Sequence, residues 1–157
     1  MRLRRSRTSR TSAQRALWSY DDGGRAASGR KGLAGDCAVR AVAIAAERGY
    51  GEVYDELAAL NKLNGGSRSA REGIPIAVLR SYLRSAGWDW TPTMSIGSGT
   101  QVHLRAHELP PGRIIARVTR HVCAVVDGVI HDVSDPSRGG TRCVYGYWSR
   151  GEELRQR

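Results

Sequence analysis

Apolar residues recur at helical spacing through the first half of the chain. Residues 36–48 are rich in alanine, with small apolar side chains on all sides, which is typical of a buried helix that begins after the N-cap residue Asp36. A second helix is predicted over residues 51–63 and a third over residues 75–86, where Pro75 suits the first helical turn. The pattern therefore predicts that three helices precede residue 88.

The second half of the chain changes to the alternating pattern of β-strands. Strands are predicted over residues 88–91, 113–119, 122–126, 129–133 and 141–148. Asp127-Gly128, between two apolar runs, is a strong signal for a two-residue hairpin turn. Because the helices come first and the strands follow, the pattern favours an α+β fold in which a helical N-terminal half packs on a C-terminal antiparallel sheet.

The positive charge of the chain is concentrated at its N-terminus. The formal net charge is +10, and six arginines lie among Ser and Thr in the first 15 residues, with no acidic residue between them. Such a segment has too little apolar surface to fold alone. We expect residues 1–32 to be a basic tail and linker, residues 33–150 one domain, and residues 151–157 a C-terminal tail. The tail is open to several interpretations: a nucleic-acid arm, a docking tail, a targeting peptide or a solubilising segment.

The cysteine content bears on the compartment of the protein. Three cysteines exclude a full disulfide framework, and the chain has no apolar stretch suited to a membrane span or a secretory signal. These features favour reduced thiols, a cytoplasmic location and no membrane partner. Cys123 and Cys143 lie in strand-like runs and are expected to be small buried side chains. Cys37 differs because it opens a helix, where the macrodipole favours the thiolate.

The predicted hairpin supplies a histidine and a carboxylate for that thiol. With Asp127-Gly128 as the turn, residues at equal distances from it pair, which places Asp132 diagonal to His121 on the same face of the sheet. At that position the carboxylate can orient the imidazole. A bulge or a longer loop would reverse the register and favour Asp135 instead. The sequence therefore predicts Cys–His–Asp catalysis by Cys37, His121 and Asp132, with Asp135 as the alternative acid.

Two further groups of residues suit other chemistry. His103 and His107 have the spacing of a zinc pair on a helix, with Cys123 or Cys143 as further ligands. The residues between the two histidines include no acid, and histidines on the rim of a pocket are the simpler interpretation. Arg138 begins an Arg-Gly-Gly loop, which suits either a substrate cleft or an ordinary turn. We expect neither a metal nor an organic cofactor.

The candidate residues resemble those of the papain-like cysteine peptidases. In that superfamily a Cys starts a buried helix, and a later His and Asn or Asp come from neighbouring strands, which is the order of Cys37, His121 and Asp132. Asp36-Cys37 and Asp135-Pro136 are most similar to the compact bacterial leader-peptide peptidases. The resemblance implies a papain-like fold and a peptide or protein substrate.

One position departs from the papain-like pattern. Those enzymes place a Gln shortly before the nucleophile to help bind the oxyanion, whereas Lys31 stands there in this chain. The resemblance then implies that the oxyanion is bound by the backbone N–H of Cys37 together with Lys31 or a loop amide. Arg138 is the other candidate for contact with the substrate.

Two narrower resemblances bear on substrate and origin. Residues 35–148 resemble small uncharacterised phage and bacterial proteins, notably in Gly-Val-Ile-His-Asp at 128–132, which implies a bacterial cell or a phage-infected host. The Asp-Cys pair and the hairpin are also similar to cell-wall amidases and endopeptidases of the NlpC/P60 type. By that likeness His131 takes the third catalytic role, although strand alternation points it away from His121.

The sequence thus supports two classes of function. The main expectation is a thiol hydrolase that cleaves an amide or isopeptide bond. The rival is a non-catalytic basic protein that uses its arginine-rich tail to bind nucleic acid or a virion component. An activated thiol at Cys37 distinguishes the first class from the second.

Overall fold

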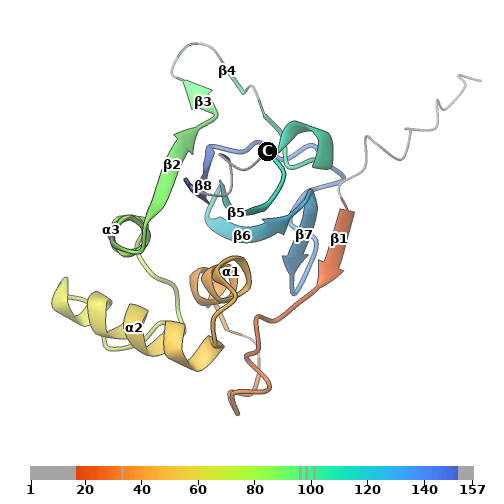
Figure 1. The fold of residues 1–157 in the computed structure, drawn as a ribbon. Helices are drawn as coiled ribbons and strands as arrows, with labels where there is room; N and C mark the ends of the chain where they lie inside the picture. The colour runs from red at the N-terminus through yellow and green to blue at the C-terminus, as the bar shows by residue number, and fades with distance from the viewer. Residues whose placement is uncertain (1–16, 33, 96, 98, 101, 152–157) are drawn as a thin grey trace, which may run out of the picture.

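Helices and sheet form two layers in the described part of the chain, which comprises residues 17–32, 34–95, 97, 99–100 and 102–151. In this computed structural model the helices are α1 (Cys37–Ala46), α2 (Tyr50–Leu63) and α3 (Ile76–Ser85). Helix α1 packs against the central strands of the sheet, α2 lies outside α1, and α3 lies beside the edge strand β2 (Figure 1). The predicted α+β class is therefore confirmed.

The helices lie within a few residues of their predicted positions. Helix α1 ends where Glu47 adopts the left-handed conformation at φ 54°, just before the end predicted at residue 48. Pro75 is the N-cap of α3 instead of lying in its first turn. Asp36 occupies the predicted N-cap of α1, but its side chain makes no capping hydrogen bond. The carboxylate of Asp36 is thus available for other partners.

The sheet is mixed. Its strand order within the described residues is β1-β7-β6-β5-β8-β2. The bounds are β1 Leu17–Tyr20, β2 Trp88–Pro92, β5 Arg113–Val118, β6 His121–Val126, β7 Val129–Asp132 and β8 Gly146–Arg150. Neighbouring strands run antiparallel except β1, which pairs in parallel with β7. The prediction of a purely antiparallel sheet is wrong at this edge.

Residues 17–32 belong to the fold, so the prediction that the ordered domain begins near residue 33 is also wrong. After β1 the chain turns through a loop that buries Arg25, which is 8% exposed. The partners of Arg25 lie later in the sequence, so local composition gave no sign that this segment is ordered. The arginine-rich residues 1–16 and the terminal residues 152–157 lie outside the described residues.

The β6–β7 hairpin has the predicted register. Val126 pairs with Val129, and Ala124 pairs with His131, around the turn at Asp127 and Gly128. Asp127 has φ 47° and Gly128 has φ 79°, as a tight turn matched to the twist of the strands requires. Because side chains alternate along each strand, this register decides which face His121 and Asp132 share.

The last strand begins later than predicted. The sequence indicated a strand over residues 141–148, whereas β8 starts at Gly146 and the preceding residues form a loop. A Cβ added at Gly146 would lie 2.4 Å from Cζ2 of Trp90, so only glycine fits beneath that ring. Trp90 in turn packs against Trp148, with ring centroids 4.5 Å apart.

Both faces of the sheet are covered by apolar side chains. Between the helices and the sheet lie Val39 and Val42 of α1, with Leu57 of α2. On the opposite face Leu104 and Val144, from loops, cover the strands. A short hairpin of β3 (Met94–Ser95) and β4 (Gly99–Thr100) and a 3₁₀ helix, η2 (Ala106–Glu108), complete the described elements. Each helix in the described residues falls short of the length and apolarity needed to cross a membrane.

Candidate active site

Cys37 opens α1 and faces a cleft. Its thiol is free and partly buried, and it contributes to the lining of a cavity of about 550 Å³. The first amides of a helix have no partner within the helix, and the macrodipole adds partial positive charge there. The Ala-rich sequence after Cys37 lets α1 pack closely on β6, which fixes the thiol at the end of the sheet.

His121 and Asp132 come together because the hairpin aligns the start of β6 with the end of β7. Nε2 of His121 lies 2.6 Å from Oδ2 of Asp132. The other ring nitrogen, Nδ1, is therefore the one left to interact with the Cys37 thiol, which lines the same cleft as His121. The diagonal contact that the sequence predicted between His121 and Asp132 is present.

The remaining acceptors of Asp132 are also occupied. Oδ1 accepts a hydrogen bond from the Val133 amide at 2.7 Å and lies 3.4 Å from Nη2 of Arg40. The backbone carbonyl of Asp132 accepts from the Trp18 indole at 3.1 Å and from the Asp21 amide at 3.0 Å. The N-terminal strand β1 thus holds the residue that orients the imidazole.

The thiol of Cys37 is acidified by its surroundings. Burial by itself raises the pKa of Cys37, but a hydrogen bond from His121, the backbone N–H of Val122, and the charges of His121 and Arg40 outweigh it. The net pKa of Cys37 lies below its ordinary value. This direction favours thiolate at neutral pH.

The imidazole of His121 shifts in the opposite direction. Burial lowers its pKa, but hydrogen bonds to Asp132 and Cys37, and their negative charges, raise the pKa of His121 to about 9. A lowered thiol pKa beside a raised imidazole pKa describes a thiolate–imidazolium pair. The two groups titrate as a unit, so the lowered pKa of Cys37 and the raised pKa of His121 have one cause.

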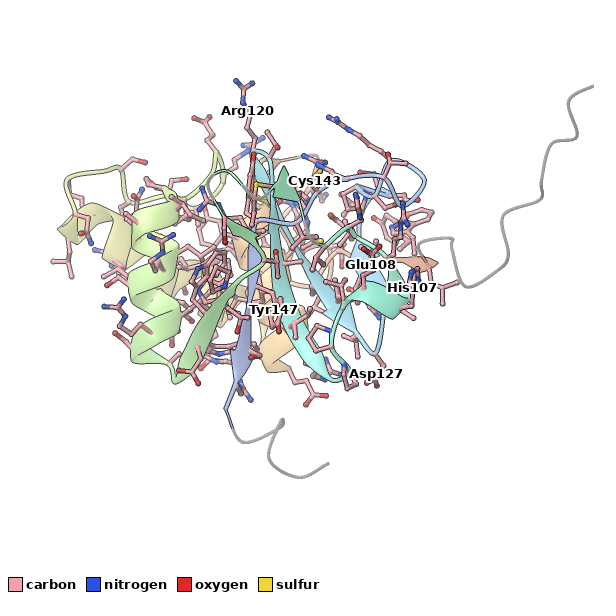
Figure 2. The ribbon with its side chains drawn as sticks, turned by 90° about the horizontal axis from the view of Figure 1, so that it is seen from above. His107, Glu108, Arg120, Asp127, Cys143 and Tyr147 are labelled. Atoms are coloured by element: carbon pink, nitrogen blue, oxygen red, sulfur yellow. The ribbon has the colours of Figure 1, made fainter. Side chains whose placement is uncertain are left out.

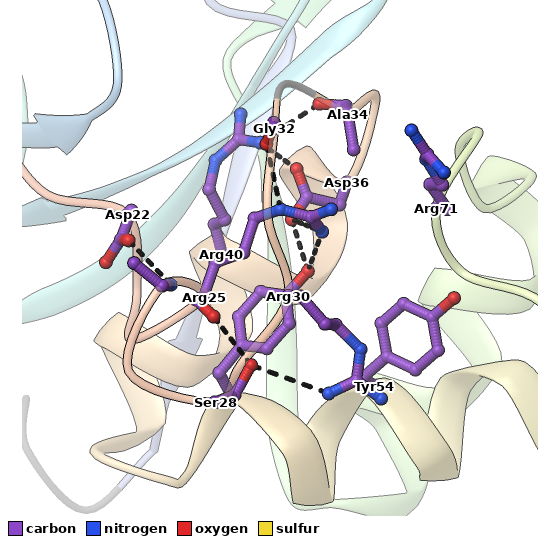
Figure 3. Close-up of polar contacts among 12 residues, drawn as sticks. Asp22, Arg25, Ser28, Arg30, Gly32, Ala34, Asp36, Arg40, Tyr54 and Arg71 are labelled. Atoms are coloured by element: carbon purple, nitrogen blue, oxygen red, sulfur yellow. Dashed lines mark hydrogen bonds and ion pairs between the residues drawn. The ribbon is translucent and has the colours of Figure 1, made fainter.

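Asp36 forms a buried polar cluster, hereafter the Asp36 cluster, with Arg25, Arg40 and Tyr50. Figure 3 shows the side chains of Arg25 and Arg40 next to Asp36. Nη1 of Arg25 lies 3.2 Å from Oδ2 of Asp36 and donates to the Tyr50 hydroxyl at 2.7 Å. Arg40 pairs with the other carboxylate oxygen, and the Tyr50 hydroxyl also donates to Asp36. Burial and the bond to Asp36 raise the pKa of Tyr50 to about 12, which keeps the hydroxyl protonated.

Arg40 joins the Asp36 cluster to Asp132. Its guanidinium bonds both carboxylates and is itself 7% exposed. Two guanidiniums, from Arg25 and Arg40, therefore face two carboxylates, from Asp36 and Asp132. Since a buried charge without a partner is costly, this pairing stabilises both carboxylates at their buried positions.

The cleft has two unlike walls. One wall comes from the segment before α3 and from the start of α3, where the partly exposed Ile74 and Ile76 supply apolar surface. The other comes from the end of β5 and the turn to β6, with Arg117 and Arg120. The cleft therefore has room for an extended substrate across the thiol at its floor.

The two alternatives to Asp132 as the partner of His121 lie away from the imidazole. Asp135 is exposed, and its Oδ1 accepts a hydrogen bond from the Ser137 amide at 2.9 Å within a local turn. His131 points away from His121, as strand alternation predicts, and its Nδ1 lies 3.2 Å from Oδ2 of Asp21. The structure thus brings Asp132, and neither Asp135 nor His131, to the imidazole of His121.

The predicted oxyanion candidates are not brought to the thiol. Lys31 is exposed and lines a neighbouring cavity, and its carbonyl accepts from Nη2 of Arg25 at 3.3 Å. Arg138 lies in an exposed turn at φ 51°, where its carbonyl accepts from the Thr141 hydroxyl. Neither Lys31 nor Arg138 is among the described residues that line the cleft of Cys37. The first amides of α1 remain as donors near the thiol.

The histidine pair at 103 and 107 does not share a helix face. His103 lies in a β-bridge with Cys143, and its Nδ1 is 3.1 Å from Oε1 of Glu108. His107 is exposed in η2, on the side of the fold away from α3 (Figure 2). Nowhere in the described chain do three His, Cys, Asp or Glu side chains gather as metal ligands do. Cys123 is fully buried, which raises the pKa of its thiol.

Arg25, Arg40 and Tyr50 were not predicted as parts of the site. An arginine four residues after Asp36, in an otherwise small and apolar helix, was the available signal, because a buried guanidinium requires an acidic partner. Arg25 gave no such signal, since it lies in a glycine-rich segment far from its partners along the chain.

Comparisons of the chain with protein-family models, with curated proteins and with solved structures give no match.

Proposed function

We propose that the protein is a thiol hydrolase of papain-like fold that cleaves an amide or isopeptide bond, with Cys37 as nucleophile. The observation that carries this proposal is the position of His121, which bonds the Asp132 carboxylate and interacts with the acidified thiol of Cys37 in the same cleft. A histidine between an acidified thiol and an orienting acid is the arrangement that nucleophilic catalysis requires.

In the first half of the reaction the Cys37 thiolate attacks the carbonyl carbon of the substrate. The carbonyl oxygen gains negative charge, and the amides of the first turn of α1 stabilise it. The imidazolium of His121 then gives its proton to the leaving nitrogen, the C–N bond breaks, and a thioester on Cys37 remains.

In the second half a water molecule attacks the thioester. His121, now neutral, accepts a proton from the water while Asp132 keeps the ring oriented through Nε2. The C–S bond breaks and the acyl group leaves as a carboxylic acid. The thiolate and the imidazolium are restored, so the cycle consumes only water.

The Asp36 cluster supports this chemistry through the two carboxylates that it holds. Arg40 neutralises part of the charge of Asp132, and Arg25 neutralises Asp36 next to the nucleophile. These residues act as positioning residues through the groups that they bind.

The test is the rate at which iodoacetamide alkylates Cys37, measured against pH in the wild type and in His121→Ala. We expect fast labelling of the wild type well below pH ~8.5, the ordinary thiol pKa, and a return to that value in His121→Ala. His131→Ala is the matched control, since His131 bonds Asp21 outside the site, and it should label like the wild type.

A wild-type thiol that titrates near pH ~8.5 and ignores His121 would overturn the proposal. The rival function, a basic binding protein, would then be tested by the salt dependence of retention on immobilised DNA and RNA, with and without residues 1–15.

A further inference from the structure

The basic wall of the cleft carries two arginines on the strand and turn that lead to His121. Arg117 lies near the end of β5, and Arg120 lies in the two-residue turn between β5 and β6. Both line the same cleft as Cys37, and Arg120 projects at the outer edge of the fold (Figure 2). They stand opposite the apolar wall formed before and within α3.

These two guanidiniums differ from the buried ones in having no carboxylate partner. The charges of Arg25 and Arg40 are balanced by Asp36 and Asp132. Within the described chain, by contrast, neither Arg117 nor Arg120 forms an ion pair. Glu72 is the one carboxylate among the described residues lining the cleft, and it comes from the opposite wall. The wall beside His121 thus presents positive charge that no carboxylate of the described residues pairs with.

The basic wall is also held in place. The guanidinium of Arg117 lies over the ring of Tyr145, 5.6 Å from its centroid, and the Tyr145 hydroxyl is 3.0 Å from Oγ1 of Thr119 in the turn. Arg120 has φ 55°, a left-handed backbone conformation that residues other than glycine, Asn and Asp seldom adopt. A long basic side chain therefore occupies a turn position where glycine is the easier choice, directly before the histidine.

We propose that Arg117 and Arg120 form a carboxylate subsite, so that the enzyme acts on peptides that carry a carboxylate beside the scissile amide. The carboxylate belongs to an acidic side chain or to the C-terminus of the substrate. Guanidinium donors match the two oxygens of a carboxylate, and the partly enclosed cleft strengthens the attraction. An apolar residue of the same substrate packs on Ile74 and Ile76. This inference rests on the proposed hydrolase function.

The test compares two alkylating reagents that differ only in charge. Iodoacetate and iodoacetamide attack the same thiolate and release the same iodide, so the ratio of their rates at Cys37 cancels the thiolate fraction. We expect the ratio of iodoacetate to iodoacetamide to fall roughly three- to ten-fold in the double variant Arg117→Gln/Arg120→Gln. The corresponding lysine variants should keep most of the ratio. Arg68→Gln, an exposed arginine outside the cleft, should leave it unchanged.

An unchanged ratio in the double glutamine variant overturns the carboxylate subsite. Failure of the proposed function gives a different result, namely slow iodoacetamide labelling that does not depend on His121. The two failures can be told apart because the ratio of the two alkylation rates can be measured whether labelling is fast or slow. Circular dichroism and Tm establish that each variant is folded. If the double variant is not, Arg120→Gln alone gives the same test, since Arg120 is exposed.

Short peptides identify the source of the carboxylate. Three sets of N-acetylated peptides are compared for protection of Cys37 against iodoacetamide: free C-termini without acidic residues, C-terminal amides with Glu or Asp, and neutral C-terminal amides. We expect at least one acidic set to protect better than the neutral set, and the better set names the source. Equal protection by all three sets of peptides overturns the proposal, and so does the absence of protection by any of them.

Discussion

Arg40 contacts Asp132 at the carboxylate oxygen that His121 does not use. Nη2 of Arg40 lies 3.4 Å from Oδ1, while Nε2 of His121 lies 2.6 Å from Oδ2. The same guanidinium pairs with Asp36, directly before Cys37. One buried side chain of α1 therefore links the carboxylate beside Cys37 to the carboxylate behind His121.

Replacement of Arg40 by Met should destabilise the protein strongly. The variant keeps the approximate length of the side chain but removes the guanidinium that contacts both Asp36 and Asp132, whereas Arg25 pairs with Asp36 alone. Breaking a buried ion pair costs about 3–5 kcal/mol. The measurement is the free energy of unfolding in urea. Arg48→Met is the control, because Arg48 pairs with partly exposed Glu52 and Glu56 and should cost about 1 kcal/mol or less. Equal losses in the two variants would contradict a buried charge network.

Asp132→Asn should weaken the thiolate–imidazolium pair. Without the carboxylate charge the pKa of His121 falls from about 9, and the pKa of Cys37 rises toward its ordinary value. The pH dependence of iodoacetamide labelling reports this shift directly. With a substrate in hand, we expect kcat/KM to fall by about 10²–10⁴, the usual contribution of acid–base catalysis. Asp135→Asn is the matched control, because the exposed Asp135 accepts a hydrogen bond from the Ser137 amide in a local turn away from His121, and it should match the wild type.

The pH profile of hydrolysis should be bell-shaped. The active form needs a Cys37 thiolate, whose lowered pKa sets the rising limb below the ordinary thiol value. It also needs a protonated His121, so activity is lost as the pH rises through about 9. The measurement is kcat/KM against pH, with labelling of Cys37 followed in parallel. Labelling should not fall on the alkaline side, because alkylation needs only the thiolate. A joint decline of both rates would point to alkaline unfolding instead.

Gly146→Ala should destabilise the sheet where β8 meets β2. The added methyl group would lie 2.4 Å from the Trp90 ring and 2.6 Å from the Thr91 carbonyl, so the strands must separate, at a cost of about 1–3 kcal/mol. Thermal unfolding measures the loss. Gly51→Ala is the contrasting variant: it lies in α2 with its nearest neighbour at 3.7 Å, and alanine there should be neutral or stabilising by about 0.5–1 kcal/mol. If both variants melt alike, the close approach of Trp90 to β8 is incorrect.

Local signals predicted the parts of the site that depend on local geometry. A helix that starts at Cys37 follows from an N-cap residue before an Ala-rich run. The turn at Asp127 and Gly128 determines the register of the hairpin, and the two-residue period of a strand then places Asp132 near His121. These inferences depend only on residues close together in the sequence, so they could be made without the structure.

Local signals failed where the partner is distant in the sequence. Asp36 reads as a capping residue, yet its carboxylate turns to Arg25 and Tyr50. Likewise Leu17–Tyr20 reads as the end of a basic tail, yet it pairs with β7 and supports the backbone of Asp132. In both cases the competing long-range interaction exists only after the chain has folded.

The sequence by itself determined the helices, the hairpin and the three residues of the candidate site, because helical and strand periodicity and turn chemistry act over a few residues. The tertiary structure alone decided that β1 joins the sheet, that Arg25 and Arg40 balance Asp36 and Asp132, and that the cleft has one apolar and one basic wall. The physical reason is burial. Charges that water would solvate separately in the unfolded chain must find partners once they are enclosed, and those partners come from whichever segments the fold brings together.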